Sequence, residues 1–112
     1  MRFGGICIET RDAPRLAAFY RILLRQEPKV EGNHYAFGNI AVYDPGGVAE
    51  AEGHPAWLQC FAAGLDAEYE RLRREIPGLK VISPPERRPW GAYSFHLADP
   101  DGNRIAVAEA AE

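Results

Sequence analysis

The chain has 112 residues, of which 46% are hydrophobic and 26% charged, and its net charge is −3. This length suits one domain with its own core, and the composition excludes disordered and collagen-like classes. No apolar run reaches the roughly 18 residues of a membrane-spanning helix, and no N-terminal apolar segment resembles a signal peptide. We therefore expect a cytoplasmic protein, without membrane insertion and, since acidic residues outnumber basic ones, without nucleic-acid binding.

The first part of the chain has the pattern of a strand, a helix and three further strands. Residues 3–9 form a β-prone run. Asp12 is a good helix N-cap, and Pro14 stands in the first turn, where its missing N–H costs nothing. Apolar residues then recur at the spacing of one buried helix face. Residues 29–31, 35–37 and 40–43 are predicted strands, separated by Gly-Asn turns.

Residues 45–55 are rich in glycine and proline and are predicted to connect two halves of a single domain. The pattern then repeats, with a strand at residues 56–62, a helix capped by Asp66, and strands at 80–83, 93–97 and 104–108. A loop is expected over residues 84–91. The fold class is therefore α+β, with βαβββ modules at residues 1–44 and 56–112.

Two segments of the chain support a family resemblance. Residues 6–24 join a strand to a capped helix that carries Phe19-Tyr20, and residues 93–107 surround the turn Asp99-Pro100-Asp101-Gly102-Asn103. Both segments resemble the vicinal oxygen chelate superfamily, which includes glyoxalase I, bleomycin-resistance proteins and extradiol dioxygenases. The resemblance implies a curled mixed sheet with a concave cavity, helices on its outer face, and a homodimer.

The resemblance also implies where a metal site would stand. Enzymes of this family hold a divalent metal with His and Glu side chains, and the three matching positions here carry Gly5, Trp57 and Ala106. Metal binding needs imidazole, carboxylate or thiolate donors, which these side chains lack. His34 and His54 fall in turn or connecting segments, and only His96 is expected in the cavity. We therefore predict no metal and no other cofactor.

Strand alternation sorts the residues that would line the cavity, because neighbours in a strand point to opposite faces. The predicted ligand-binding set combines aromatic surfaces with a few polar groups, as small-molecule sites usually do. Its members are Cys7, Trp57, Gln59, Phe61, Trp90, Ser94, His96 and Arg104. The same alternation places Cys7 and Cys60 on opposite faces, which disfavours a disulfide between them.

Several of these residues also have a purely structural interpretation. Trp57 could fill the core, His96 could hydrogen-bond a neighbour, and Arg104 could pair with Glu9 or with a turn carboxylate. The segment around Trp90 could form a lid, a dimer contact or a solvated turn.

The sequence predicts a metal-free protein that binds an aromatic or amphipathic small molecule. One alternative is an enzyme of the same superfamily, a lyase, isomerase or dioxygenase, with His96 as acid or base or with a relocated metal site. Another alternative is a regulatory module whose cavity is filled by its own side chains.

Overall fold

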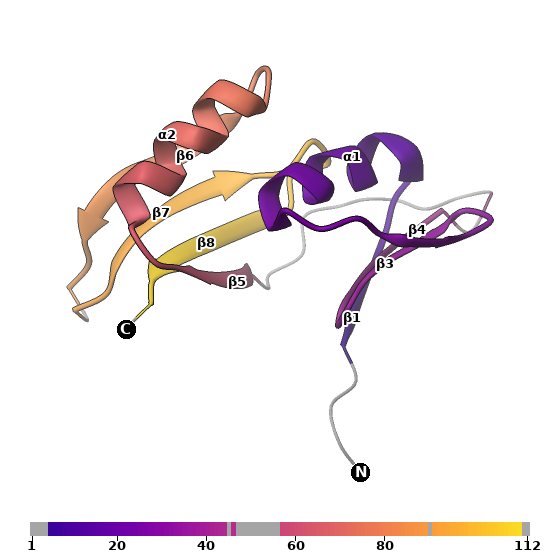
Figure 1. Cartoon of the computed structure of the whole chain (residues 1–112), viewed down its shortest axis with the longest axis horizontal. Coiled ribbons are helices and arrows are strands. Elements are labelled where there is room, and N and C mark those ends of the chain that lie inside the picture. Colours follow the sequence, from indigo (N-terminus) through magenta and orange to yellow (C-terminus); the bar gives the residue numbers. More distant parts are fainter. Residues whose placement is uncertain (1–4, 45, 47–56, 90, 111–112) are drawn as a thin grey trace, which may run out of the picture. The chain divides into compact units, whose positions relative to one another are not determined.

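The chain divides into two compact units, Met1–Glu52 and Gly53–Glu112. The computed structural model describes residues 5–44, 46, 57–89 and 91–110, so most of the connecting segment 45–55 lies outside the described residues. Each unit contains one helix and one four-stranded sheet (Figure 1). No helix in the described part of the chain is long and apolar enough to cross a membrane.

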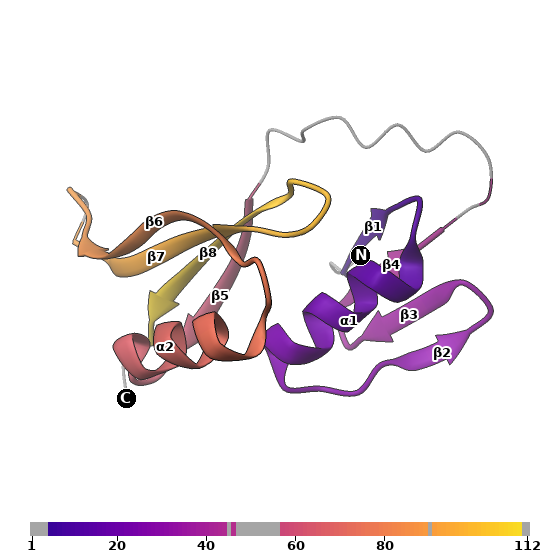
Figure 2. The same ribbon diagram turned by 90° about the horizontal axis from the view of Figure 1, so that it is seen from above.

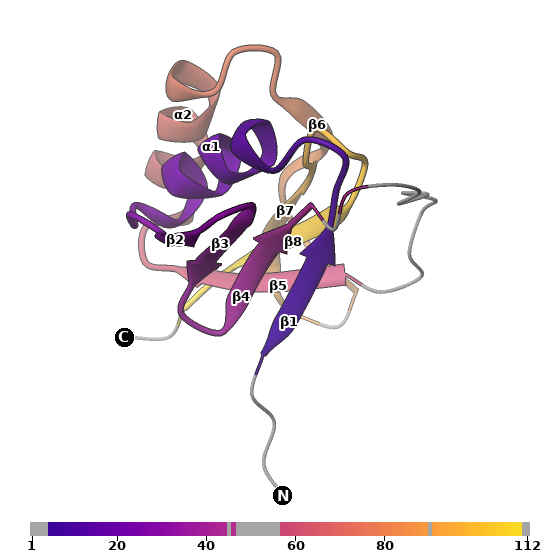
Figure 3. The ribbon, with the colours of Figure 1, turned by 90° about the vertical axis from the view of Figure 1, so that its right-hand side faces the viewer.

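The first unit is a βαβββ module. Its elements are β1 (Ile6–Glu9), α1 (Ala13–Leu24), β2 (Lys29–Glu31), β3 (His34–Phe37) and β4 (Ile40–Tyr43). The strands are ordered β1-β4-β3-β2, with β1 parallel to β4 and the other pairs antiparallel. Figure 3 shows α1 lying along one face of this sheet.

The second unit repeats this topology. Its elements are β5 (Trp57–Ala62), α2 (Leu65–Glu75), β6 (Lys80–Arg87), β7 (Tyr93–Ala98) and β8 (Arg104–Glu109). The strands are ordered β5-β8-β7-β6, and β5 is again parallel to its neighbour. Figure 2 shows α2 on one side of these strands. The predicted α+β class with two βαβββ modules is confirmed.

The sheet face that each helix covers carries the apolar core of its unit. In the first unit Tyr20 of α1 meets Phe37 of β3, with ring centroids 6.5 Å apart. In the second unit Tyr69 of α2 meets the fully buried Phe95 of β7 at 5.2 Å. Because side chains alternate along a strand, these contacts identify which residues face the helix and which face away.

The two helices begin differently. The Asp12 carboxylate caps α1 by accepting a hydrogen bond from the Arg15 amide at 3.2 Å, as predicted. The predicted cap of the second helix, Asp66, is wrong: Gly64 is the N-cap residue and makes no side-chain cap. Asp66 lies instead within the first turn, where its charge complements the helix dipole and its carboxylate accepts a 2.6 Å hydrogen bond from the Tyr93 hydroxyl.

The third strand of the second unit is longer than predicted. Residues 84–87 were expected in a loop, but β6 continues to Arg87 through Pro84 and Pro85. Its pairing with β7 shifts between Ser83 and Glu86. Proline is tolerated here because β6 is an edge strand and the irregular pairing leaves places where no amide donor is required.

Candidate ligand-binding face

The face of the second sheet opposite α2 gathers most of the predicted ligand-binding residues. The registers of β5, β8 and β7 define three rows across this face: Trp57, Arg104 and Ala98; Gln59, Ala106 and His96; Phe61, Ala108 and Ser94. Their neighbours along the strands, including Phe95 and Ile105, are buried on the α2 side. The structure therefore brings six of the predicted residues onto one surface.

Two large aromatic side chains on this face are accessible. Trp57 is 39% exposed and Phe61 is 68% exposed, although both are apolar and neither lies at a turn. Burying an aromatic side chain of this size stabilises a fold substantially. Aromatic residues that stay exposed therefore commonly mark contact sites. Trp57 and Phe61 are therefore the apolar elements that this face offers to a ligand.

Trp57 is held between a histidine and an arginine. The His96 ring meets it edge to face, with ring centroids 4.8 Å apart. The guanidinium carbon of Arg104 lies 5.4 Å from the Trp57 ring centroid, within the range of a cation–π interaction. These two contacts hold the indole against polar groups of the other strands of this face.

The middle of this face is formed by small side chains. Ala106 and Ala108 project from β8, whereas the flanking strands carry larger groups such as Trp57 and His96. Ala106 occupies the position where metal-binding members of the predicted family carry a glutamate. A methyl group in place of a carboxylate removes a negative charge from the centre of the face, where the Trp57 and His96 rings from the flanking strands meet above β8.

Arg88 is a residue of this face that the sequence did not single out for binding. Its buried guanidinium donates to the Ser94 hydroxyl at 2.9 Å through Nε, to the Ser94 carbonyl at 3.0 Å through Nη2 and to the Ser83 hydroxyl at 3.0 Å through Nη1. Nη1 also pairs with the Glu86 carboxylate. No sequence signal separates Arg88 from its exposed neighbour Arg87, because only the pairing of β6 with β7 decides which one folds over the sheet.

His96 is electrostatically perturbed by these neighbours. Partial burial and the positive charge of Arg88 lower the pKa of His96 below its ordinary value, while Glu86 acts in the opposite direction. The neutral imidazole is therefore favoured near pH 7 and is able to accept a hydrogen bond or a proton.

The remaining predicted site residues lie elsewhere. Cys7 belongs to the first unit, where it is exposed on β1, and burial together with the charge of Glu9 raises the pKa of its thiol. Cys60 points toward α2, and burial raises its pKa. Both cysteines are free thiols. Trp90 lies outside the described residues.

The residues at the family's metal-ligand positions do not fit a metal ion. Trp57 and Ala106 offer no donor atom, and the backbone at Gly5 leaves no room for one. Gly5 has φ +152°, and a Cβ built there would lie 2.2 Å from the carbonyl oxygen of Asn39. Within residues 5–44, 46, 57–89 and 91–110, no group of three His, Cys, Asp or Glu side chains is placed to hold a metal.

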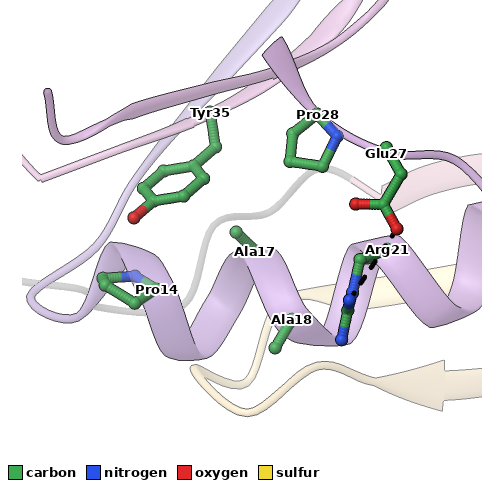
Figure 4. A pocket seen from close by; sticks show the side chains of 7 residues that line it. All are labelled: Pro14, Ala17, Ala18, Arg21, Glu27, Pro28 and Tyr35. Carbon is green, nitrogen blue, oxygen red and sulfur yellow. Dashed lines mark ion pairs between the residues drawn. The ribbon is translucent and has the colours of Figure 1, made fainter. Parts of the chain in front are cut away.

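A small pocket of about 260 Å³ lies within the first unit, between α1 and the segments around β2 and β3 (Figure 4). Its lining residues are Pro14, Ala17, Ala18, Arg21, Glu27, Pro28 and Tyr35. The charged groups at one end, Arg21 and Glu27, form a solvent-exposed ion pair at 3.7 Å. The pocket is below the usual 300–1,000 Å³ of small-molecule sites, so the second sheet is the better candidate site.

The fold and the surface opposite α2 define a βαβββ protein of the vicinal oxygen chelate type. A family model described as "Glyoxalase/Bleomycin resistance protein/Dioxygenase superfamily" matches residues 2–107, and the chain belongs to this superfamily. No curated protein sequence matches the chain significantly.

Solved structures agree with this assignment. A protein of unknown function from Agrobacterium tumefaciens is 28% identical, with a TM-score of 0.85 over 99% of this chain and 95% of that one. A glyoxalase-related enzyme from Fulvimarina pelagi is 17% identical, with a TM-score of 0.77 and coverage of 98% and 89%. A superfamily member from Sphaerobacter thermophilus is 21% identical, with a TM-score of 0.73 and coverage of 98% of both chains. The Fulvimarina and Sphaerobacter proteins are only 17% and 21% identical to this chain, so their similarity shows the shared fold alone.

Proposed function

We propose that this chain is a metal-free small-molecule-binding protein that holds an aromatic or amphipathic ligand on the second-sheet face opposite α2. One observation carries the proposal: Trp57 and Phe61 are exposed on the same face as the polar groups of Gln59, His96 and Arg104. An apolar surface with a few convergent polar groups is the usual composition of a small-molecule site. The side chains at the metal positions support a binding role rather than chelate chemistry.

In its biological setting, we propose a cytoplasmic homodimer. Paired copies would cover exposed apolar groups outside the binding face, such as Ile6 and Val30, together with free strand edges. Sedimentation equilibrium tests this part of the proposal, and a single species of one chain's mass at all concentrations would contradict it.

Calorimetric titration of the full chain against aromatic metabolites and glycopeptide antibiotics tests the binding function. Phe61→Ala should weaken binding because it removes an exposed ring from the proposed site. The matched control is Val81→Ala, which removes exposed apolar surface from the α2 side of the same sheet. Equal effects of the two substitutions, or no binding anywhere in the panel, would contradict the proposal.

A second candidate function is acid–base catalysis by His96. It is favoured by the lowered pKa of His96, which leaves the imidazole able to accept a proton near neutral pH. His96→Gln should then abolish turnover of a bound substrate while ligand binding and the fold persist. Unchanged turnover in that variant would remove His96 from the chemistry.

A further inference from the structure

The second-sheet face opposite α2 has a different charge balance from the chain as a whole. The chain carries 16 acidic and 13 basic residues. The described charged side chains that the strand register and the Arg88 contacts place on this face are Lys80, Glu86, Arg88 and Arg104. Three cations therefore accompany one carboxylate here, and this local excess of positive charge attracts anions and repels cations.

The charge of Arg88 is fixed in place by its partners. Its side chain is only 7% exposed, and the single carboxylate it meets, Glu86, is 57% exposed. Its other acceptors are the neutral oxygens of Ser83 and Ser94. Glu86 therefore offsets much of the Arg88 charge, and the net positive charge of the face comes mainly from Lys80 and Arg104.

Arg104 is an accessible cation of the same face and lies next to Trp57. It is exposed and lies against the Trp57 ring, and within the described residues it has no ion-pair partner. A guanidinium held on an aromatic ring presents a planar fork to a carboxylate.

We propose that the ligand of this face is a planar aromatic acid, and this inference rests on the proposed binding function. The ligand ring stacks on the accessible surface of Trp57, which is 39% exposed. Its carboxylate pairs with Arg104, and Lys80, in the same row of the sheet, adds to the attraction. The chemistry selects against aromatic cations, because they would face the same positive charges.

Three matched probes test this specificity: 2-naphthoate, 2-naphthol and 2-naphthylmethylammonium, which share one ring system and differ in charge. Fluorescence titration of the full chain should give the tightest binding for 2-naphthoate, about tenfold tighter than 2-naphthol, and the weakest for the cation. Added salt should weaken 2-naphthoate binding more than 2-naphthol binding.

Two variants separate a local contact from the general charge of the protein. Arg104→Gln should reduce the preference for 2-naphthoate over 2-naphthol by about tenfold. Arg74→Gln, which removes the same charge from the exposed side of α2, should leave that preference unchanged. Retention of the full preference in Arg104→Gln would overturn the assignment of the carboxylate to Arg104.

The outcomes also separate this inference from the function on which it rests. Binding of 2-naphthol as tight as that of 2-naphthoate, or tightest binding of the cation, would overturn the aromatic-acid proposal and leave the binding function standing. Failure of all three probes to bind the full chain would count against the binding function itself.

Discussion

The Cα of Gly5 lies so close to the carbonyl group of Asn39 that a Cβ at position 5 would stand 2.2 Å from the Asn39 oxygen. The same oxygen accepts a 2.8 Å hydrogen bond from the Ile6 amide, which ties the start of β1 to the turn before β4. A side chain at position 5 would therefore displace the Asn39 carbonyl and disturb this hydrogen bond.

Gly5→Ala should destabilise the protein by about 3 kcal/mol, because the added methyl group collides with backbone and the backbone angle disfavours any side chain. Gly32→Ala is the matched control, since Gly32 also has positive φ but nothing within 4 Å of an added Cβ. Gly32→Ala should lower the free energy of unfolding by about 1 kcal/mol. Urea unfolding measures both changes, and equal costs would refute the steric explanation.

Asp99 organises the turn between β7 and β8. It is fully buried and accepts hydrogen bonds from the Asp101 amide at 2.9 Å, the Asn103 amide at 2.8 Å and the Asn103 side chain at 2.7 Å. Asp99→Ala should cost about 3 kcal/mol because it leaves these donors without that carboxylate. Asp12→Ala, which removes the single 3.2 Å cap of α1, should cost only about 1 kcal/mol. If urea unfolding showed a smaller loss of stability for Asp99→Ala than for Asp12→Ala, this role of Asp99 would be contradicted.

His96 should make stability depend on pH. Its pKa in the folded state is lowered by burial and by Arg88, with Glu86 opposing, so the unfolded chain binds the proton more readily. Stability is then complete above the ordinary value of 6.5 and falls as the pH drops from there through the folded-state pKa.

His96→Gln tests this pH dependence, because it removes the titrating group. Urea midpoints measured at pH 8 and pH 5.5 should differ less in this variant than in the unsubstituted chain. An identical difference in both would show that His96 does not contribute.

The contact between β7 and α2 should be visible in tyrosine titration. The hydrogen bond from the Tyr93 hydroxyl to Asp66 raises the pKa of Tyr93 above its ordinary 10.0, assisted by burial and by the Asp66 and Glu109 charges and opposed by Arg87. Asp66→Asn should therefore shift the Tyr93 transition to lower pH. Ultraviolet absorbance titration, with Tyr93→Phe to identify the signal, measures this shift; an unchanged transition would mean that the hydrogen bond does not persist in solution.

Local patterns in the sequence were sufficient for most of the architecture. The helical spacing of apolar residues, the Asp12 cap and the repeated strand order predicted two βαβββ modules, because these features depend on residues close together in the chain. Strand alternation also predicted that Trp57 and Phe61 share one face. The absence of donor atoms at Trp57 and Ala106 follows from the sequence directly, once the family resemblance identifies those positions.

Other features depend on which strands pair and in what register. The extension of β6 through two prolines follows from its position at a sheet edge, and no local pattern identifies an edge strand. The selection of Arg88 over Arg87 follows from the irregular register between Ser83 and Glu86. The contact of Gly5 with Asn39 joins residues that only the parallel pairing of β1 with β4 brings together. The sequence by itself determined which side chains the protein carries. The pairing of distant strands determined which of these side chains meet, because a side chain's neighbours across a sheet are set by long-range hydrogen bonding.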